Sequence, residues 1–378
     1  MSNQKSEISH HQSTPGPVRR FITEHFLHFN SRELVAAAAA YERHIHAGGA
    51  MLVSLAGAMS TAKLGRTLAR LIRAGYVDAI SCTGANLEED VYNLLAYPDY
   101  KLCPNWRALS AQDELELYRQ GYNRVTDTCI PEDVMHHLEG RLLERWKHAS
   151  DAGERKFHSQ FVLELLASGE LDEHFRGEPD DAWTLAAGEM QIPVYTPGWE
   201  DSTTGNMFAA AVARGELASH ICVKSGTEQM QHLLSWYQRH SRNVPAPAAA
   251  AVAARADATD TPQPTNDQPT NAQPTSADPA DATATPAPGF FQVGGGIAGD
   301  FAICAVPTLV HDMKQTDTPP WGYFCQISDA VTSYGGYSGA VPNEKITWGK
   351  LAPDTPSFMI QSDATIVAPL IFAYLLND

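Results

Sequence analysis

Residues 51–61 read M-L-V-S-L-A-G-A-M-S-T and contain the unit from which the fold is predicted. Met51–Ala56 has the composition of a short buried strand, a tight turn follows, and helical spacing then runs from Thr61 to Ala74. Small residues between a strand and a helix N-terminus form the usual anion-binding corner of an open α/β sheet. The turn lacks a G-x-G-x-x-G pattern, and many such turns bind nothing. Two interpretations therefore remain: the turn binds a phosphate at Ser60 and Thr61, or it binds no ligand.

The order strand, turn and helix recurs along the chain. Each predicted strand is followed by a turn rich in Gly, Ser, Thr and Asp, and these turns are expected to collect on one edge of a sheet. A repeated order of this kind indicates an α/β protein with a mostly parallel, doubly wound sheet and helices on both faces. After the first unit, the predicted strands are Val77–Ser81, Ile192–Tyr195, Ser219–Val223, Gly289–Val293, Gly322–Ile327 and Ser357–Gln361.

Composition divides the chain into one domain and two segments that are predicted to be disordered. Residues 1–20 are polar without an apolar period, and residues 244–288 consist almost entirely of Ala, Pro, Thr, Asp, Gln and Asn. Such segments bury too little apolar area to offset their ordering entropy. Because the α/β pattern continues on both sides of the second segment, we expect residues 21–378 to form a single domain that this insertion interrupts. Residues 97–130 are expected to be an irregular excursion.

Charge and cysteine content restrict the class of protein. The 378 residues include 44 acidic and 27 basic side chains, for a formal net charge of −17, which argues against non-specific binding of nucleic acid. The six cysteines form no C-x-x-C pair and follow no secretory signal. Reduced thiols in a cytoplasmic protein are therefore expected, rather than a zinc site or a disulfide framework. The apolar runs are too short to span a membrane.

Residues 334–350 read Y-G-G-Y-S-G-A-V-P-N-E-K-I-T-W-G-K and are predicted to form a structured functional loop. An aromatic side chain beside a carboxylate suits a cationic amine, and Trp348 and Glu344 supply both. A lysine that is partly desolvated or close to bound cations can lose its proton and form an imine, which would be the role of Lys350. The alternative interpretation is a glycine-rich surface loop with an ordinary lysine.

The end of this loop, N-E-K-I-T-W-G-K, resembles the active-site segment of the deoxyhypusine synthase family, which carries a Glu and then W-G-K. The triplet that starts at Ser338 also matches, and further motifs occur in the family's order over most of residues 20–378. The resemblance implies that Lys350 is the imine-forming catalytic lysine, Trp348 an aromatic wall and Glu344 an amine anchor. It also implies a Rossmann-like fold and a homotetramer with active sites shared between subunits.

The resemblance further implies that NAD is bound. The family's T-x-G-G-x-E-E-D segment corresponds to residues 83–90, where Glu89 takes the place of the acid that contacts the cofactor ribose. Acids in the first turn of a helix are also expected from the helix dipole alone. The positions expected to contact NAD are Ser60, Thr61, Thr83, Gly84, Glu89, Asp201, Gly295, Gly296, Asp329, Ala330, Asp363 and Ala364.

Three positions depart from the family pattern. Asn206 stands where an acid contacts the amine, Asp300 where a histidine assists proton transfer, and Tyr337 where the loop has an acid. We expect these residues and Ser338 to contact the polyamine. The departures favour a divergent bacterial-type branch that transfers an aminobutyl group from spermidine to a small amine such as putrescine, yielding homospermidine. A protein lysine as acceptor, another NAD-linked amine reaction, and a non-catalytic NAD- or polyamine-binding protein remain as alternatives.

Overall fold

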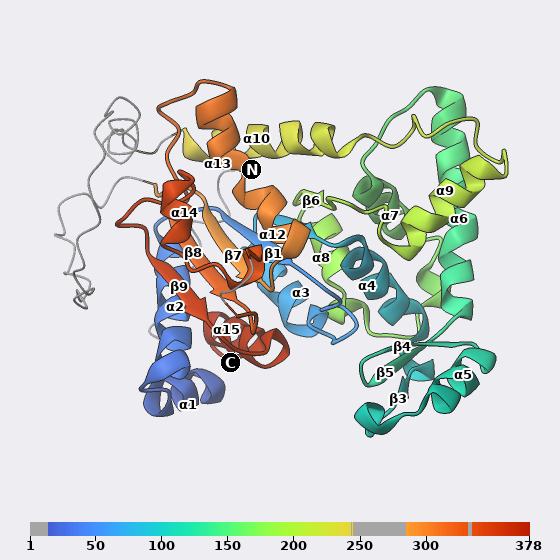
Figure 1. The fold of residues 1–378 in the computed structure, drawn as a ribbon, viewed down its shortest axis with the longest axis horizontal. Coiled ribbons are helices and arrows are strands. Elements are labelled where there is room, and N and C mark those ends of the chain that lie inside the picture. Colours follow the sequence, from blue (N-terminus) through green and yellow to red (C-terminus); the bar gives the residue numbers. More distant parts are fainter. Residues whose placement is uncertain (1–13, 243, 245–284, 332–334) are drawn as a thin grey trace.

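The computed structural model describes residues 14–242, 244, 285–331 and 335–378, and Figure 1 shows how they are arranged. Among these residues, one large sheet has the strand order β6-β2-β1-β7-β8-β9, and every neighbouring pair is parallel. The prediction of a doubly wound α/β fold is confirmed. The strands of this sheet are β1 (Met51–Leu55), β2 (Ala79–Cys82), β6 (Val194–Tyr195), β7 (Gly289–Val293), β8 (Tyr323–Ile327) and β9 (Ser357–Ile360).

The direction of winding reverses between β1 and β7. The chain runs outward from β1 to β2 and β6, returns to the centre at β7, and runs outward again to β8 and β9. The loops that diverge at this point contain Gly57 and Gly294, whose φ angles are +58° and +78°. Open α/β sheets bind ligands beyond the carboxyl ends of the strands, at the point where the strand order reverses. The topology therefore places a candidate ligand site beside these two glycines.

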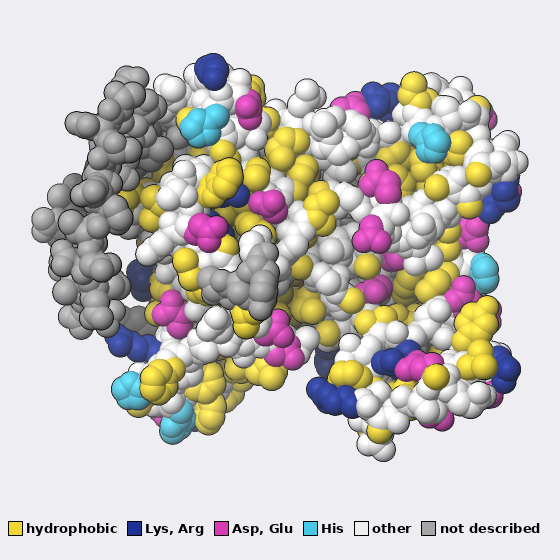
Figure 2. Space-filling model, viewed as in Figure 1, with side chains coloured by type: hydrophobic (Ala, Val, Ile, Leu, Met, Phe, Trp, Pro, Cys, Tyr) yellow, Lys and Arg dark blue, Asp and Glu magenta, His cyan; other side chains and the backbone are white. Residues whose placement is uncertain are grey.

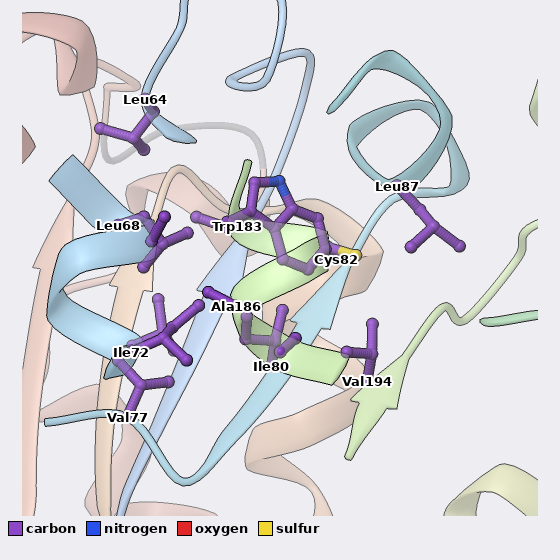
Figure 3. Close-up of a cluster of buried hydrophobic side chains, with 14 of the residues drawn as sticks. Leu64, Leu68, Ile72, Val77, Ile80, Cys82, Leu87, Trp183, Ala186 and Val194 are labelled. Carbon is purple, nitrogen blue, oxygen red and sulfur yellow. The ribbon is translucent and has the colours of Figure 1, made fainter. Parts of the chain in front are cut away.

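Helices cover both faces of the sheet (Figure 1). Successive strand residues alternate between two cores, with Val53 of β1 in the first and Leu52 in the second. Figure 3 shows part of the first core, where Leu68 and Trp183 lie near Ile80 of β2. The helices of the first core include α2 (Phe29–His46), α3 (Gly65–Arg73), α8 (Trp183–Glu189) and α15 (Ala364–Leu376), and those of the second include α10 (Gly226–Ser241), α12 (Gly296–Ile303) and α13 (Ala305–Pro307).

The irregular excursion predicted for residues 97–130 is wrong. This segment forms the helix α5 (Ala111–Arg119) and most of a small antiparallel sheet with the order β3-β5-β4. The hairpin between β4 and β5 turns at Thr126, with φ +55°, where the Asn or Gly typical of such turns would have indicated it. The strands and the flanking helices are β3 (Lys101–Leu102), β4 (Tyr122–Val125), β5 (Thr128–Pro131), α4 (Gly84–Ala96), α6 (Asp133–Ala152), α7 (His158–Ala167) and α9 (Thr203–Ala213).

Two further element predictions differ from the structure. The strand predicted at Ser219–Val223 is wrong, because Ile221 is 63% exposed and Val223 makes only an isolated bridge to Lys156. An apolar run this short cannot by itself distinguish a buried strand from a turn. The helix predicted from Thr61 begins only at α3, after a turn in which Lys63 has a positive φ of 60°.

The disordered tail predicted for residues 1–20 is wrong for its last residues. Residues 1–13 lie outside the described part of the chain, but α1 (Pro17–His25) begins with proline in its first turn. Arg19 pairs with Glu42 at 2.6 Å, which holds α1 against α2.

Most of the predicted insertion lies outside the described residues. Its last residues, 285–288, are described, and Pro288 O accepts a hydrogen bond from Gly322 N at 2.9 Å. The fold therefore resumes a few residues before the predicted boundary. No helix in the described part of the chain is long and apolar enough to cross a membrane.

Candidate active site

Lys350 lies in a buried position beside α12. The residue is 7% exposed and follows the short helix α14 (Glu344–Thr347), and its carbonyl accepts a hydrogen bond from Trp321 N at 3.1 Å. Its Nζ lies 3.3 Å from Oδ1 of Asp300 on α12. Among the described residues, this carboxylate is the one ion-pair partner of Lys350. The chain thus presents a buried lysine amine that is paired with a single carboxylate.

Aromatic rings form two walls around the Lys350 amine. Its Nζ lies 5.5 Å from the centroid of the Tyr337 ring and 5.9 Å from that of Trp348. Tyr337 is held by a 2.7 Å hydrogen bond that its hydroxyl donates to Gln292 Oε1, and burial raises the pKa of its phenol well above its usual value. Trp348 is 64% exposed and forms the rim. Both rings can stabilise a cationic amine by cation–π attraction.

Ser338 fastens the loop of Lys350 to the central sheet. Its hydroxyl accepts a hydrogen bond from Gly296 N at 3.1 Å, and its carbonyl accepts one from Gln326 Nε2 at 2.5 Å. Gly295 packs directly on Ser338, because a Cβ at this glycine would collide with the Ser338 hydroxyl and lie 2.7 Å from its Cα. Gly295 and Gly296 therefore contact the lysine loop in this structure.

We expect Gly295→Ala to displace this loop and to lower the free energy of unfolding by about 1–3 kcal/mol, because the added methyl group has no space beside Ser338. Thermal and denaturant unfolding would measure the change. Gly140→Ala, in the interior of α6, is the matched control, since nothing lies within 4 Å of its added Cβ. The control should gain up to about 1 kcal/mol from helix propensity. Equal effects of the two substitutions would contradict the packing assigned to Gly295.

The two remaining predicted substrate residues make no described contact with Lys350. Glu344 begins α14 and is exposed, without an ion pair among the described residues. Asn206 lies on α9, where its Nδ2 donates to Ser202 O at 2.8 Å. Figure 1 shows α9 and α14 on opposite sides of the molecule. One chain alone therefore does not bring Asn206 to Lys350.

A cleft of about 1240 Å³ opens at the carboxyl ends of β1, β7, β8 and β9, at the winding reversal. Of the predicted cofactor residues, it is lined by Thr61, Asp329, Asp363 and Ala364. Residues around the small sheet form the opposite wall, so that the two sheets enclose the cleft. Lys350 does not line it. The further lining residues that matter here are Gly57, Lys63, Tyr97, Arg107, Thr126 and Gly294.

Buried polar atoms without hydrogen-bond partners lie at this cleft and next to it. Thr61 lines the cleft, whereas Glu89 does not line it but lies next to Thr61. Glu89 is 8% exposed, and neither its Oε2 nor the Thr61 hydroxyl has a hydrogen-bond partner among the described residues. Burial is the main cause that raises the pKa of Glu89 to about 7. A buried carboxylate without a donor is suited to accept from ribose hydroxyls, and glycine backbone allows close approach of a pyrophosphate. Lys63 and Arg107 add positive charge to the same cleft.

Several residues that are predicted to bind NAD make hydrogen bonds or close packing contacts within the protein. The Ser60 hydroxyl donates to Asn86 O at 2.7 Å and accepts from Trp183 Nε1 at 3.0 Å. A Cβ at Gly84 would lie 2.7 Å from Ser202 Oγ, so this glycine permits close packing of two segments. Their contact with NAD stays a prediction.

The other predicted cofactor positions lie at the N-termini of α4 and α9 and after the end of β8. The Thr83 hydroxyl caps α4 and donates to Gly57 O at 2.8 Å, and Asp201 is exposed before α9. Ala330 follows Asp329 beside the cleft, and its N–H donates to Ser328 Oγ at 3.2 Å. These contacts with NAD also remain predictions.

Sequence reasoning missed Lys345, a second lysine in the same loop. It is 3% exposed, and burial, together with the nearby Lys350 charge, lowers its pKa to about 8. No periodic pattern could have revealed this burial, because α14 is a single turn.

The sequence model of the deoxyhypusine synthase family matches residues 23–232 and 280–375 of this chain. The chain belongs to the deoxyhypusine synthase family. This family consists of NAD-dependent transferases of aminobutyl groups from spermidine. A deoxyhypusine synthase-like protein of Thermosynechococcus vestitus is 26% identical over 96% of this chain and 81% of its own length. A "Probable deoxyhypusine synthase 2" of Archaeoglobus fulgidus is 24% identical over 85% of both chains.

A solved structure supports the fold of this deoxyhypusine synthase family member. A crystal structure from Entamoeba histolytica, described as a deoxyhypusine synthase, has a TM-score of 0.51 and 11% sequence identity, and the match covers 93% of this chain and 90% of that one. At this level of identity the likeness concerns the fold alone. The expected Rossmann-like fold and family membership are thus confirmed, whereas the roles of individual site residues remain predictions.

Proposed function

We propose that the protein transfers the aminobutyl group of spermidine to a small diamine such as putrescine, yielding homospermidine. The observation that carries this proposal is the position of the Lys350 amine, which is buried, 3.3 Å from Asp300 and flanked by the Tyr337 and Trp348 rings. Such a site can hold a cationic amine and bring its carbon to the lysine nitrogen.

We assign NAD to the cleft at the winding reversal, with Glu89 and Thr61 at a ribose and the backbone near Gly57 and Gly294 at the pyrophosphate. Bound at these residues, NAD would supply reversible acceptance of a hydride between the spermidine amine and the product imine, with no net oxidation. Asp363, at the N-terminus of α15, lies on the side of the cleft formed by β8 and β9.

Lys350 would act by exchange of imines. Its neutral amine attacks the imine carbon, the bond to 1,3-diaminopropane breaks, and that amine leaves with a proton. The four-carbon unit remains as an imine on Lys350, while Asp300 offers a carboxylate to a nearby ammonium group. The acceptor amine then displaces Lys350 by the same exchange, which restores the free lysine.

The acceptor is inferred to be small because of the two departures beside Lys350. Tyr337 replaces a loop acid with a buried ring, and Asp300 places a carboxylate where the family has a histidine. A ring and one carboxylate can hold a short diamine through cation–π attraction and an ion pair.

Within one chain, the residues predicted to contact NAD and those predicted to contact the amine lie in separate places. This separation supports an active site that is shared between copies of the chain. Lys350 does not line the cleft assigned to NAD, and α9, which carries Asn206, lies on the other side of the molecule from α14 (Figure 1). Exposed apolar side chains surround the lysine loop, with Ile297 53%, Val341 41% and Trp348 64% exposed. Figure 2 shows hydrophobic and acidic side chains intermixed over α12 and α14. A second copy seated on this face would cover the apolar groups and bring its own cleft to Lys350.

The proposal is tested by incubating the purified protein with spermidine and NAD, trapping with borohydride, and locating adducts by mass spectrometry. We expect a butylamine adduct on Lys350 and release of 1,3-diaminopropane. Addition of putrescine should then yield homospermidine. A protein-lysine acceptor would appear as labelling of the hypusine-containing translation factor instead. Binding of NAD and spermidine with neither adduct nor diaminopropane would contradict an enzymatic role and support a binding protein.

A further inference from the structure

We propose that Lys63 and Arg107 form a two-sided cationic clamp for the diphosphate of a dinucleotide in the cleft between the two sheets. Lys63 belongs to the turn that precedes α3, on the wall of the large sheet, and Arg107 belongs to the segment before α5, on the wall of the small sheet. The clamp rests on the proposed binding of NAD in this cleft. It adds to that proposal two side chains outside the predicted cofactor positions.

Aromatic rings, instead of carboxylates, hold both cations in place. Lys63 Nζ lies 3.9 Å from the centroid of the Tyr97 ring, and the guanidinium carbon of Arg107 lies 4.2 Å from that of the Trp106 ring. Both rings also line the cleft. Within the part of the chain that the structure describes, neither cation forms an ion pair. Because a ring orients a cation without neutralising its charge, both cations remain available to an anionic ligand.

The backbone of Lys63 adopts a conformation that lysine rarely takes. Its φ of +60° lies in the left-handed region, which glycine and asparagine occupy at lower cost. The Lys63 N–H donates a hydrogen bond to Ser60 O at 2.9 Å, and this bond closes the turn before α3. Any residue except proline can make the same bond, so it does not explain a lysine here. Unfavourable backbone conformations cluster at ligand sites, which points to a role for the side chain.

Partial burial of Lys63 makes its ammonium group responsive to an anion. The side chain is half-buried, and burial lowers its pKa, while the charges of Asp181 and Asp90 partly oppose this effect. Neither acid is close enough to form an ion pair with the amine. A phosphate oxygen beside the amine would supply the missing counter-charge, and solvent would screen this contact less than one at an open surface.

The acids of the cleft do not neutralise these cations. Three acidic residues line the cleft, and none forms an ion pair with a cation of the lining among the described residues: Asp127, Asp329 and Asp363. The Asp363 carboxylate caps α15 by accepting a hydrogen bond from Thr365 N at 2.8 Å. The third cation of the lining, Lys101, has its amine 3.9 Å from the centroid of the Tyr122 ring. The cleft is therefore lined by cations that lack acidic partners.

A diphosphate is the group that this arrangement fits. In a dinucleotide the diphosphate carries two negative charges and joins two riboses. Thr61, which is assigned to a ribose, lies two residues before Lys63 in the same turn. Gly57 and Gly294, both with positive φ, allow backbone to approach a ligand in the same cleft. Cations on opposite walls can then each contact one phosphate through a charge-assisted hydrogen bond.

The test separates the diphosphate from the rest of the cofactor. The whole protein is titrated by calorimetry with ADP-ribose, which carries the diphosphate without nicotinamide, and with adenosine, which carries no phosphate. Lys63→Gln and Arg107→Gln each remove one charge. Lys224→Gln is the matched control for the lysine, because its amine also lies over a ring, 4.9 Å from the centroid of Phe157, but does not line the cleft. Arg119→Gln, exposed on α5, is the control for the arginine.

We expect Lys63→Gln to weaken ADP-ribose binding about 10- to 100-fold, and Arg107→Gln, at a more exposed position, about 3- to 10-fold. Adenosine affinity should stay within about twofold in both variants, because adenosine offers no charge to these residues. The two control substitutions should leave both affinities unchanged. Raising the salt concentration should weaken ADP-ribose binding less in the double variant than in the unchanged protein.

A further variant, Lys63→Asn, distinguishes lost binding from misfolding. Asparagine lacks the charge but tolerates the left-handed backbone better than lysine does. We expect weakened ADP-ribose binding together with an unfolding midpoint at or above that of the unchanged protein. Unchanged ADP-ribose affinity in Lys63→Gln and Arg107→Gln would overturn the clamp, as would equal losses for ADP-ribose and adenosine. Failure of the unchanged protein to bind ADP-ribose would also overturn it.

Failure of the clamp and failure of aminobutyl transfer are distinguishable. ADP-ribose binding that depends on Lys63 and Arg107, without any butylamine adduct on Lys350, would support the clamp and count against the transfer reaction. An adduct on Lys350 together with unchanged ADP-ribose affinity in both Gln variants would overturn the clamp and leave the transfer reaction standing.

Discussion

Lys350→Arg is expected to abolish aminobutyl transfer, with a loss of at least about a thousandfold in the release of 1,3-diaminopropane. Arginine keeps a positive charge that can pair with Asp300, so the loop should retain its anchor. The guanidinium group remains protonated and cannot exchange with an imine. The variant therefore separates the nucleophilic role of the amine from its ion pair. Diaminopropane release and borohydride-trapped adducts provide the measurement.

Two measurements serve as controls for Lys350→Arg: the affinity for NAD and the unfolding midpoint. We expect NAD affinity and the unfolding midpoint of Lys350→Arg to stay close to those of the unchanged protein, because arginine keeps the positive charge beside Asp300 and Lys350 does not line the cofactor cleft of its own chain. A full rate of diaminopropane release in this variant would remove Lys350 from the mechanism. A trapped adduct on Lys345 in its place would identify the neighbouring amine as the carrier.

Glu89→Gln is expected to stabilise the free protein above pH 7 while it weakens NAD binding. Burial raises the pKa of Glu89 from 4.5 to about 7, so the unfolded chain releases this proton before the folded one. The stability associated with Glu89 is therefore fully present below pH 4.5 and is lost as the pH rises through about 7. Removing the ionisable group should recover on the order of 2–3 kcal/mol at pH 8. Denaturant unfolding at pH 5 and pH 8 measures the difference.

The same substitution should reduce NAD affinity about 10- to 100-fold, because a ribose hydroxyl then donates to a neutral amide instead of a carboxylate. Titration calorimetry on the unchanged protein should show weaker binding below pH 7. Glu88→Gln is the matched control on the same helix. Glu88 is 3% exposed and accepts hydrogen bonds from Thr203 N and Thr204 N at 2.9 Å and 2.8 Å, so its loss should destabilise α9. Reduced affinity in Glu88→Gln alone would exclude Glu89 as the ribose acid.

Local patterns predicted the local structure well. The predicted first strand, Met51–Ala56, is β1 extended by one residue, and Gly289–Val293 coincides with β7. Short buried strands followed by small-residue turns are recognisable because their signal lies within a few consecutive residues. The same reasoning failed for residues 97–130 and at Ser219–Val223, where an unusual turn residue or an exposed apolar side chain departs from the common pattern.

The sequence by itself determined the alternating α/β order, the family and the lysine of the W-G-K motif. Only the tertiary structure decided where the winding reverses, because strand order depends on pairing between segments that lie far apart in the chain. It also decided that α9, which carries Asn206, and α14, which precedes Lys350, lie on opposite sides of the molecule. The burial of Lys345 was likewise decided only by the tertiary structure. A lysine in a one-turn helix looks exposed in sequence, and only the packing of Phe324 and Tyr337 around it removes it from water.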